Sequence, residues 1–381
     1  MPRTYKPIRA LVVTVILAAV ASTRVLAVGS GPTFPTSRNL PAFLAGGDIS
    51  LLTLEEQHGQ VYRWHGTALP ALQIFKNAGW NCLRLRLWVH PTKQGIFVND
   101  LAYTEALGRR IKQAGFYFVL DLHYSDTWAD PGHQLVPAAW QQLNIKQLSS
   151  KVFTYTSKVI SALKAAGAMP DMVAVGNEIS PGMMWPLGRI TKGEGGFAHL
   201  AELLKAGIAG VRAGSGASPS PLIMIHLDRG GDWPTTRWFF DRCAKYGVNY
   251  DVIGESFYPI FQGTLQALKN TLDHAAARFH RPVIVAETGY AYEDDGRMPV
   301  AGVNYPKTPD GQAQFLSDLV KVVKSTPDSL GRGIIYWAPE WIPMRGLDGS
   351  WHGLTLFDDG GDALPGLDVL GQAASPHAPI K

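Results

Sequence analysis

Short apolar runs alternate with longer segments of helical period along most of the 381-residue chain, from residue 42 onward. Runs of this kind, rich in β-branched and aromatic residues and bounded by Gly or Pro, are typical of buried strands. The sequence predicts strands at 43–49, 81–88, 116–123, 172–178, 221–227, 250–257, 282–288 and 333–338. It predicts helices at 67–78, 101–114, 146–166, 197–213, 235–246, 264–279 and 310–325, with a short last helix near 365–373.

Glycines occupy the end of four predicted helices, just before the next strand: Gly79, Gly115, Gly167 and Gly247. Glycine is favoured at helix ends because it adopts the left-handed conformation that stops a helix. Continuous apolar strands joined by helices imply a parallel sheet covered by helices. Eight such units over 42–375 predict an α/β fold, a (β/α)8 TIM barrel in a single domain. A doubly wound open sheet is the alternative, but no GxGxxG follows the first strand, which disfavours a nucleotide-binding version.

The N-terminus has the pattern of a secretory signal peptide. Basic residues at positions 3, 6 and 9 precede an apolar run at 10–21, and small residues surround Ala27. Twelve apolar residues are too few to span a bilayer, so we expect cleavage near Ala27 and not a membrane anchor. Residues 28–41 are rich in Gly, Pro and Ser and predict a flexible tail. We expect a secreted protein, extracellular or periplasmic, that has no membrane contact after signal cleavage.

The composition is that of an ordinary globular protein, with 46% hydrophobic residues and a net charge of +4. No basic run of five or more residues occurs, which argues against nucleic-acid binding. The chain is long enough to form a full core without a metal or disulfide, so we expect Cys82 and Cys243 to be buried free thiols. The 11 Trp residues suit stacking against sugar rings. We expect a monomer.

Polar and aromatic residues gather where the predicted strands end. TIM-barrel enzymes place their chemistry at this carboxyl-terminal face. Each residue alone has a structural explanation, but burying so many polar groups costs several kcal/mol apiece unless they are paired. A functional site therefore explains the set better than chance. The set consists of Asp48, Arg84, Arg86, Trp88, Asp121, His123, Tyr124, Asp126, Trp128, Asn177, Glu178, His226, Asp228, Glu255, Tyr258, Glu287 and Trp337.

Glu178 and Glu287 end the fourth and seventh strands, three places apart in an eight-stranded ring, so they can face each other across its mouth. Two carboxyl groups across a cleft suit glycoside cleavage, one protonating the leaving oxygen and the other attacking or stabilising the anomeric carbon. Arg84 or Arg86 could keep the nucleophile ionised, and Tyr258 could hydrogen-bond to it.

Two further residues would contact the sugar itself. Asn177 could bind the sugar 2-hydroxyl, and Trp337 could form a flat floor under the ring. We expect no metal ion or organic cofactor. The rival chemistry is a metal site of Asp121, His123, Asp126 and His226, but such sites generally need more histidines, and both glutamates would then have no role.

Seven ordered stretches carry a resemblance to a known family: GGDIS (46–50), NCLRLRLWVHP (81–91), DLHYSDTWADPG (121–132), VAVGNEISPGMMWPLG (173–188), DVIGESFYPIFQGTL (251–265), PVIVAETGY (282–290) and IIYWAPEWIP (334–343). The chain resembles glycoside hydrolase family 53, the endo-β-1,4-galactanases, within the clan A retaining glycosidases. The resemblance implies cleavage of β-1,4-galactan, as in arabinogalactan and pectin side chains, with Glu178 as acid/base and Glu287 as nucleophile. It also implies that His123, Asn177, Tyr258 and Trp337 shape the subsite at the cleaved bond, and that Trp88, Asp126 and Trp128 line the sugar groove.

The chain departs from the family pattern at a few positions. A bulky apolar residue is usual where Glu255 stands, and Trp-Glu-Pro-Ala-Trp is usual where residues 337–341 read Trp-Ala-Pro-Glu-Trp. A Lys is usual at His133, and a His-Gly pair at Gln262-Gly263. Glu255 would either lie near the nucleophile and raise a pKa there, or pair with an Arg.

Other readings of the sequence stay open. Some relatives hold calcium after the last strand, but we expect the acidic turns here, Asp348, Asp358, Asp359 and Asp362, to be solvated loops. The alternatives for function are another clan A endo-glycosidase, of mannanase or xylanase type, and a non-catalytic carbohydrate-binding protein.

Overall fold

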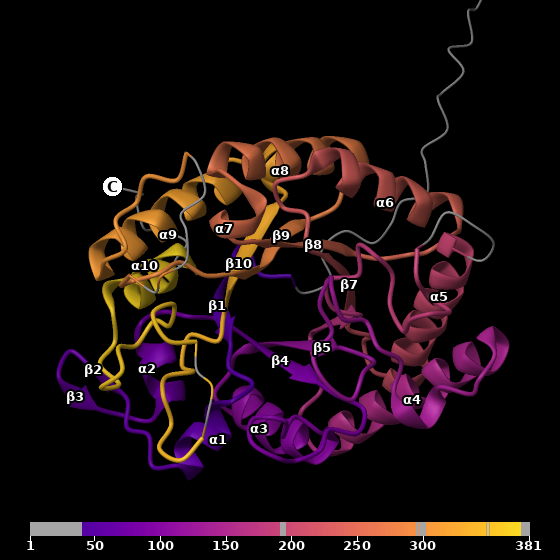
Figure 1. Ribbon diagram of the computed structural model, residues 1–381, viewed down its shortest axis with the longest axis horizontal. Coiled ribbons are helices and arrows are strands. Elements are labelled where there is room, and N and C mark those ends of the chain that lie inside the picture. Colours follow the sequence, from indigo (N-terminus) through magenta and orange to yellow (C-terminus); the bar gives the residue numbers. More distant parts are fainter. Residues whose placement is uncertain are drawn as a thin grey trace, which may run out of the picture. The chain divides into compact units, whose positions relative to one another are not determined.

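The computed structural model describes residues 40–190, 196–294, 296, 302–347, 349 and 351–374. Eight parallel strands close into a barrel in the order β1-β10-β9-β8-β7-β6-β5-β4. Figure 1 shows the strands as an inner ring with helices around it. Closure confirms the TIM barrel and excludes the open doubly wound sheet.

The barrel strands are β1 (Leu44–Asp48), β4 (Cys82–Leu87), β5 (Tyr117–Leu122), β6 (Met172–Val175), β7 (Leu222–Leu227), β8 (Val252–Phe257), β9 (Val283–Thr288) and β10 (Gly331–Trp337). The α-helices are α1 (Leu52–Gln57), α2 (Ala71–Asn77), α3 (Leu101–Gln113), α4 (Ile145–Ala165), α5 (Gly196–Ser215), α6 (Trp233–Lys245), α7 (Pro259–Gln262), α8 (Leu265–Phe279), α9 (Pro309–Lys324) and α10 (Pro365–Ala374). Two 3-10 turns, Ala138–Trp140 and Pro327–Ser329, and a hairpin of β2 (Arg63–Trp64) and β3 (Thr67–Ala68) complete the fold.

The barrel interior is filled according to the two-residue period of a strand. Near the amino-terminal ends of the strands, apolar side chains that alternate with outward-facing ones form a separate buried cluster. We call this cluster the barrel floor: Leu44, Cys82, Val119, Met172, Ala174, Met224, Val252, Ile284, Ala286 and Ile335. The side chains at the alternate positions of each strand face outward, pack against the surrounding helices and belong to the large outer core. Layered packing of this kind is usual in TIM barrels and makes the interior solid.

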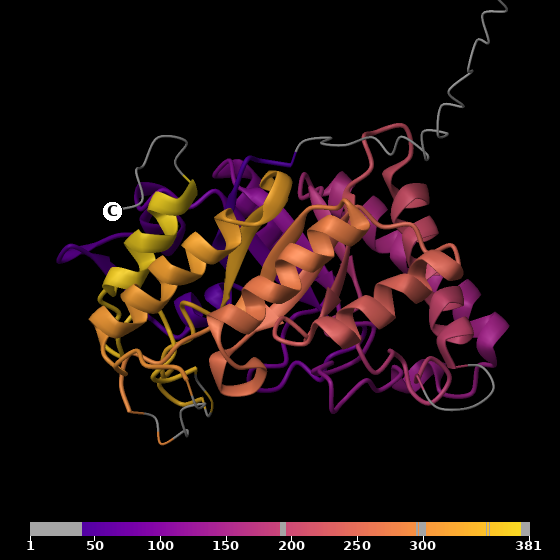
Figure 2. The ribbon, with the colours of Figure 1, turned by 90° about the horizontal axis from the view of Figure 1, so that it is seen from above.

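The helices begin and end where local chemistry predicts. Asn144 and Gln147 form a capping box on α4, and Asp100, Thr264 and Thr308 cap the first turns of α3, α8 and α9. All four glycines predicted to end helices have positive φ, between 68° and 98°. In Figure 2 the orange helices α8 and α9 lie over the outside of the barrel, with their strands behind them.

Some boundaries differ from the predicted ones for identifiable reasons. The fourth strand ends at Val175 and not at 178, because Gly176 turns out of the extended conformation at φ 93°. The helix predicted at 67–78 begins at Ala71, since Thr67 and Ala68 pair in the hairpin and Pro70 precedes the first turn. Helices α1 and α7, of six and four residues, are too short for a periodic signal and were not predicted.

Both cysteines are buried free thiols, as predicted, with Cys82 in the barrel floor and Cys243 on α6. The predicted signal peptide (1–27) and nearly all of the predicted tail (28–41) lie outside the described residues. None of the helices in the described part of the chain combines the length and apolar character needed to cross a membrane.

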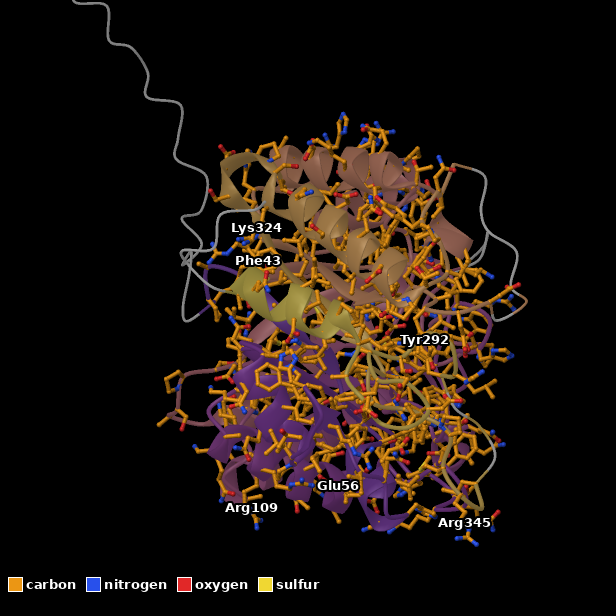
Figure 3. All side chains as sticks on the ribbon, turned by 90° about the vertical axis from the view of Figure 1, so that its left-hand side faces the viewer. Phe43, Glu56, Arg109, Tyr292, Lys324 and Arg345 are labelled. Atoms are coloured by element: carbon orange, nitrogen blue, oxygen red, sulfur yellow. The ribbon has the colours of Figure 1, made fainter. Side chains whose placement is uncertain are left out.

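The two ends of the barrel can be told apart in Figure 3. Phe43, just before β1, and Lys324, whose Nζ lies 5.0 Å from the centre of the Phe43 ring, mark the amino-terminal end. Tyr292 and Arg345, from the loops that follow β9 and β10, lie toward the opposite side of the view. The candidate site is at this second, carboxyl-terminal end.

Candidate active site

The Glu287 side chain points into the barrel because β9 contains an irregularity. Along β8 and β9 the register pairs Glu255 with Val285 and then Ser256 with Glu287, so β9 holds one extra residue, Ala286. The pairing of β9 with β10 shifts in the same place. Simple alternation from Ile284 and Ala286, both in the barrel floor, would turn Glu287 outward. The bulge re-aims its carboxyl group inward, a common use of bulges beside active sites.

Glu178 stands on a tight turn after β6. Gly176 and Glu178 have positive φ values of 93° and 49°, and this conformation is unusual for a glutamate. The turn is held from below by Gln134, whose Nε2 donates to the backbone oxygens of Asn177 at 2.8 Å and Glu178 at 3.4 Å. The backbone strain is therefore braced by a buried amide, and it directs the Glu178 carboxyl group into the site.

A buried charge network fixes Glu287. The Arg84 guanidinium donates from Nη2 to Glu287 Oε2 at 2.5 Å and from Nε to Asp48 Oδ2 at 2.7 Å, and its Nη1 lies 3.5 Å from Asp121 Oδ2. These three carboxylates raise the pKa of Arg84 well above its ordinary value despite burial. Tyr258 donates from its hydroxyl to Glu287 Oε1 at 2.9 Å. Both oxygens of Glu287 thus accept hydrogen bonds, which suits a carboxylate.

Glu178 has the opposite environment. Burial raises its pKa well above the ordinary value, and the negative charge of Glu287 adds to the effect. Asp228 raises it further, while the hydroxyl of Ser256 and the charge of Arg84 act in the other direction. The pair therefore combines a carboxylate held by a cation with a carboxyl group that keeps its proton, the division of roles that acid-base cleavage needs.

His123 is a neutral hydrogen-bonding group. Its Nδ1 accepts from Trp88 Nε1 at 3.3 Å and from the Ala129 backbone N–H at 3.2 Å, so the ring proton is on Nε2. Burial lowers the pKa of His123 to about 4, in spite of the attraction of Asp121. A neutral imidazole N–H in the site is suited to a sugar hydroxyl and not to proton transfer near neutral pH.

The two glutamates line one groove that has two lobes. Both lobes share Asp130, Glu178, Glu287, Trp337 and Trp351. The wider lobe, of about 670 Å³, adds residues from the ends of β7 and β8, among them Asp228, Arg229, Asp232, Tyr258, Phe261 and Gln262. The narrower lobe, of about 390 Å³, adds His123, Trp128, Ala129, Asn177 and Trp341. The groove thus extends to both sides of the carboxyl pair.

Tryptophans form the floor of the narrower lobe. Trp337 meets Trp351 edge-on, with ring centres 4.5 Å apart, and Trp128 stacks near Trp341 at 6.3 Å. Behind them the Arg86 guanidinium lies 4.5 Å from the centre of the Trp128 ring. Flat aromatic surfaces with a polar rim are suited to pyranose rings.

Most of the predicted site residues come together in the groove, and a few lie elsewhere. Arg84 and not Arg86 reaches Glu287; Arg86 instead hydrogen-bonds to Asn99 at 3.1 Å and stacks on tryptophans. Trp88 is fully buried behind Trp128. The predicted groove residue Asp126 lines neither lobe, because its oxygens accept the backbone N–H groups of residues 90 and 138.

Glu255 lies outside the barrel interior, away from the nucleophile. Its Oε1 accepts from the Thr236 hydroxyl at 2.9 Å and its Oε2 from the Arg229 backbone N–H at 3.0 Å. Burial raises its pKa to about 8. Successive residues of a strand point to opposite faces, so Glu255 faces outward because Ser256, the next residue on β8, faces inward. Neither expectation for Glu255 is confirmed, because its contact with Arg229 is to the backbone N–H and the guanidinium is directed to Ser180 and Asp228.

Several groove residues were not predicted from the sequence as part of the site. Arg229, Trp341 and Trp351 come from loops beyond the strand ends and Phe261 from the short helix α7, while Gln134 lies in a loop and supports the Glu178 turn without lining either lobe. Apart from Gln134, which is neither aromatic nor charged, the available signal was their aromatic or charged character next to strands already assigned to the site. Among the described residues, the structure holds no group of three or more His, Cys, Asp or Glu arranged to bind a metal ion.

The residues of the rival metal site are arranged differently from metal ligands. Asp121 lies 3.5 Å from Arg84, 4.0 Å from His123 and 3.9 Å from His226, while His226 Nε2 is 2.9 Å from the Ser256 hydroxyl. Asp126 is committed to two backbone N–H groups. The contacts of these four residues are thus with other protein groups, and Asp121 is an ion-pair partner of Arg84.

A closed (β/α)8 barrel with a carboxyl pair in an aromatic groove defines a glycoside hydrolase. The family model for glycosyl hydrolase family 53 matches residues 44–370, and the chain belongs to this family. It is 40% identical to an uncharacterized protein from Niallia circulans, over 86% of this chain and 93% of that protein.

Several relatives carry a named activity. The chain is 37% identical to an arabinogalactan endo-β-1,4-galactanase of Thermothelomyces thermophilus, over 85% of this chain and 98% of the relative. A solved fungal β-1,4-galactanase structure superposes with a TM-score of 0.78 and 36% identity, covering 86% of this chain and 98% of that one.

Proposed function

We propose that this protein is a secreted endo-β-1,4-galactanase that cleaves β-1,4-galactan with net retention of configuration. The observation that carries the proposal is the contrast between two carboxyl groups in one groove. Arg84 and Tyr258 hold Glu287, while burial and the charge of Glu287 raise the pKa of Glu178. The names of the relatives supply the polysaccharide, because they are arabinogalactan endo-β-1,4-galactanases.

The reaction divides into two displacements. In the first, Glu287 attacks the anomeric carbon while Glu178 gives its proton to the oxygen of the departing galactan segment, leaving a galactosyl ester on Glu287. In the second, Glu178 as carboxylate takes a proton from water, whose oxygen attacks the anomeric carbon and releases Glu287. Two inversions at the same carbon give net retention. No cofactor takes part in either step.

The neighbours of the pair have roles that follow from their contacts. Asn177 donates from Nδ2 to the Ala129 carbonyl at 2.8 Å, whereas its Oδ1 has no hydrogen bond to a described residue, which leaves it for the sugar 2-hydroxyl. His123 offers its Nε2 proton to a further hydroxyl, and Trp337 supports the ring. Arg84 stabilises the negative charge of Glu287 before it attacks and when it leaves in the second step, and Tyr258 orients it.

The groove supports endo cleavage. Both lobes adjoin the catalytic pair, so polymer can occupy positions on either side of the cleaved bond. Asp126 and Trp88 would then act on the substrate through the loop and the Trp128 ring that they support.

Activity assays on paired variants test the assignment. Glu287→Gln should reduce kcat on galactan by at least about 10⁴-fold, and azide should restore turnover of an activated aryl galactoside by Glu178→Ala. Glu202→Gln, at a half-buried glutamate on α5 that pairs with Lys146, is the matched control and should keep full activity. NMR of the first-formed anomer should show retention. Near-normal rates in both site variants, or an inverted product, would refute the roles.

A panel of polysaccharides tests the substrate. Reducing-sugar release should be high on β-1,4-galactan and at background on mannan and xylan. Preferred cleavage of mannan or xylan would support another clan A endo-glycosidase instead, and binding without turnover would support a carbohydrate-binding protein.

Export and domain structure are part of the same proposal. We infer that residues 1–27 are removed as a signal peptide, that 28–41 form a tail and that 42–375 form the catalytic domain, which acts as a monomer. The support is the basic and apolar pattern of the N-terminus. N-terminal sequencing of protein recovered outside the cytoplasm should begin at Val28, and light scattering should give the mass of one chain.

A further inference from the structure

The wider lobe of the groove contains a fixed arginine that the two-step mechanism does not use. Arg229 follows β7, and its Nε donates to the Ser180 hydroxyl at 3.2 Å and lies 3.4 Å from Asp228 Oδ2. Asp228 in turn accepts a hydrogen bond from the Ser180 hydroxyl. Gln262 completes the support, since its Nε2 donates to the Asp228 carbonyl at 3.2 Å.

The terminal amino groups of Arg229 remain available to hydrogen-bond to a ligand. The side chain is 38% exposed, and neither terminal amino group makes a hydrogen bond to a residue that the structure describes. A guanidinium whose Nε is fixed presents its other donors in a rigid plane, which costs less conformational entropy on binding than a free side chain. Two neighbouring sugar hydroxyls match this arrangement.

Phe261 adds an apolar surface to the same lobe. It is 73% exposed, the highest value among the large hydrophobic residues described as exposed. Its ring lies edge-on to Tyr258, with ring centres 6.1 Å apart, and Tyr258 is held by Glu287. An exposed aromatic ring that lines a groove is suited to the apolar face of a sugar.

The position of the lobe relative to the acid identifies which part of the substrate it receives. The ring that is attacked needs Asn177, His123 and the tryptophan floor, and Asn177 and His123 line the narrower lobe. The acid must face the oxygen of the departing sugar. Ser180 and Asp228 lie beside Glu178, and the Asp228 charge acts on it, so the departing sugar extends into the wider lobe.

The charges of the wider lobe restrict the kind of sugar. Among the described residues that line it, Arg229 is the single cation, against the aspartates 130, 228 and 232 and the two catalytic glutamates. The Arg229 charge is already offset by Asp228. A uronate would meet net repulsion, whereas a neutral hexose would meet hydrogen-bonding groups.

We propose that the wider lobe is the subsite for the departing and accepting sugar, that Arg229 and Phe261 are its specificity-determining residues, and that it selects neutral galactosyl units over uronates. This proposal rests on the proposed galactanase function for the identity of the sugar. The same lobe would hold the acceptor if a second sugar, in place of water, took the galactosyl group from Glu287.

Transfer and hydrolysis measured together test the proposal. An aryl β-galactobioside serves as donor, and β-1,4-galactobiose or digalacturonate as acceptor, with products separated by chromatography. We expect transfer to galactobiose and none to digalacturonate. Arg229→Met should lower kcat/KM on galactan by about 10- to 100-fold, and at least about tenfold more than on the aryl donor, because an activated aryl group departs without hydroxyl contacts.

Controls separate a binding role from a structural one. Phe261→Ala, at an exposed position, should lower the ratio of transfer to hydrolysis even if Arg229→Met folds poorly. Arg278→Met removes an arginine that pairs with Asp241 far along α8 and should leave every ratio unchanged.

Equal losses on galactan and the aryl donor, unchanged transfer ratios in both site variants, or efficient transfer to digalacturonate would overturn the proposal. Wild-type enzyme that leaves galactan intact would refute the galactanase function, while the transfer ratios would still test the lobe.

Discussion

The two halves of the barrel interior are built by the same strands and have opposite chemistry. Toward the amino-terminal ends, the interior positions hold the apolar barrel floor, whose members are all fully buried. Toward the carboxyl-terminal ends, positions of the same parity hold Asp48, Arg84, Asp121 and His226. These polar residues are as deeply buried as the floor, with exposures of 0–1%.

The difference shows where the fold is stabilised and where the chemistry is performed. Burying apolar area stabilises the fold by roughly 25 cal/mol per Å², whereas burying charges stabilises little unless every partner is present. Arg84 holds the upper network together, since it hydrogen-bonds to Asp48 and Glu287 and forms an ion pair with Asp121. We therefore expect changes in the floor to affect stability alone, and changes in the network to affect both stability and catalysis.

Removing Arg84 should have the largest effect. Arg84→Met leaves Asp48, Asp121 and Glu287 close together without their cation, which should destabilise the fold by about 3–5 kcal/mol. The lost support of Glu287 should also lower kcat/KM by about 10³-fold. Denaturant unfolding and galactan hydrolysis measure the two effects, with exposed Arg63→Met as control. A variant that keeps more than a tenth of the activity would contradict the role of the network.

A change in the floor should separate stability from activity. Leu44→Ala removes a fully buried side chain at the start of β1 and should cost about 2–5 kcal/mol of unfolding free energy. Activity assayed well below the unfolding temperature should remain within about twofold of wild type, since distant sites act independently. Val61→Ala, at an exposed position, is the control for stability. A large fall in kcat would show that the two halves are coupled.

The buried, outward-facing carboxyl group of Glu255 should make the free energy of unfolding depend on pH. Burial raises the pKa of Glu255 to about 8 from an ordinary value of 4.5, so its proton is lost more readily in the unfolded chain. Its favourable contribution is complete below pH 4.5 and declines as the pH rises toward 8. Glu255→Gln, whose amide oxygen can accept from the Arg229 N–H while its amide nitrogen donates to the Thr236 hydroxyl, should match wild type at pH 4.5 and be more stable by about 4 kcal/mol at pH 8. A constant difference across this range, measured by thermal unfolding, would count against this account.

The smallest effect should be a shift in the pH profile. Asp228 raises the pKa of Glu178, so Asp228→Asn should lower that pKa. Protonated Glu178 is required for the first step, and activity falls as the pH rises through its pKa. The basic limb of kcat/KM against pH should therefore move to lower pH in the variant. An unmoved limb, or a move to higher pH, would show that Asp228 does not act on the acid.

The fold could be predicted because its signals are periodic and repeated. Eight apolar runs, the helix-ending glycines and the length of the chain together left few architectures open. The two-residue period of a strand also predicts which way the Glu255 side chain faces. Glu255 is three residues from Tyr258 and so faces the other side of the sheet, which explains why it points to α6.

The site was predictable as far as the strand ends and less so beyond them. Glu178 and Glu287 line one groove, yet their orientation depends on a positive φ and on a bulge, neither of which appears in the alternation of residue types. Arg229 and Trp351 lie on loops, and Phe261 on the four-residue helix α7, whose positions depend on tertiary contacts. Asp126 lies in the predicted region of the site but does not line the groove, because its carboxyl oxygens accept hydrogen bonds from two nearby backbone N–H groups.

The extra residue in β9 has a further consequence for how such a barrel can change. Straightening the bulge while keeping every residue would restore regular alternation at the end of β9 and turn Glu287 away from the barrel interior. The reacting carboxylate would then face the helical shell, buried among apolar neighbours and remote from any polysaccharide. A designer who idealised the strand at constant length would therefore produce an inert barrel unintentionally, whereas deleting the extra residue would leave the glutamate opposite the inward-facing Ser256.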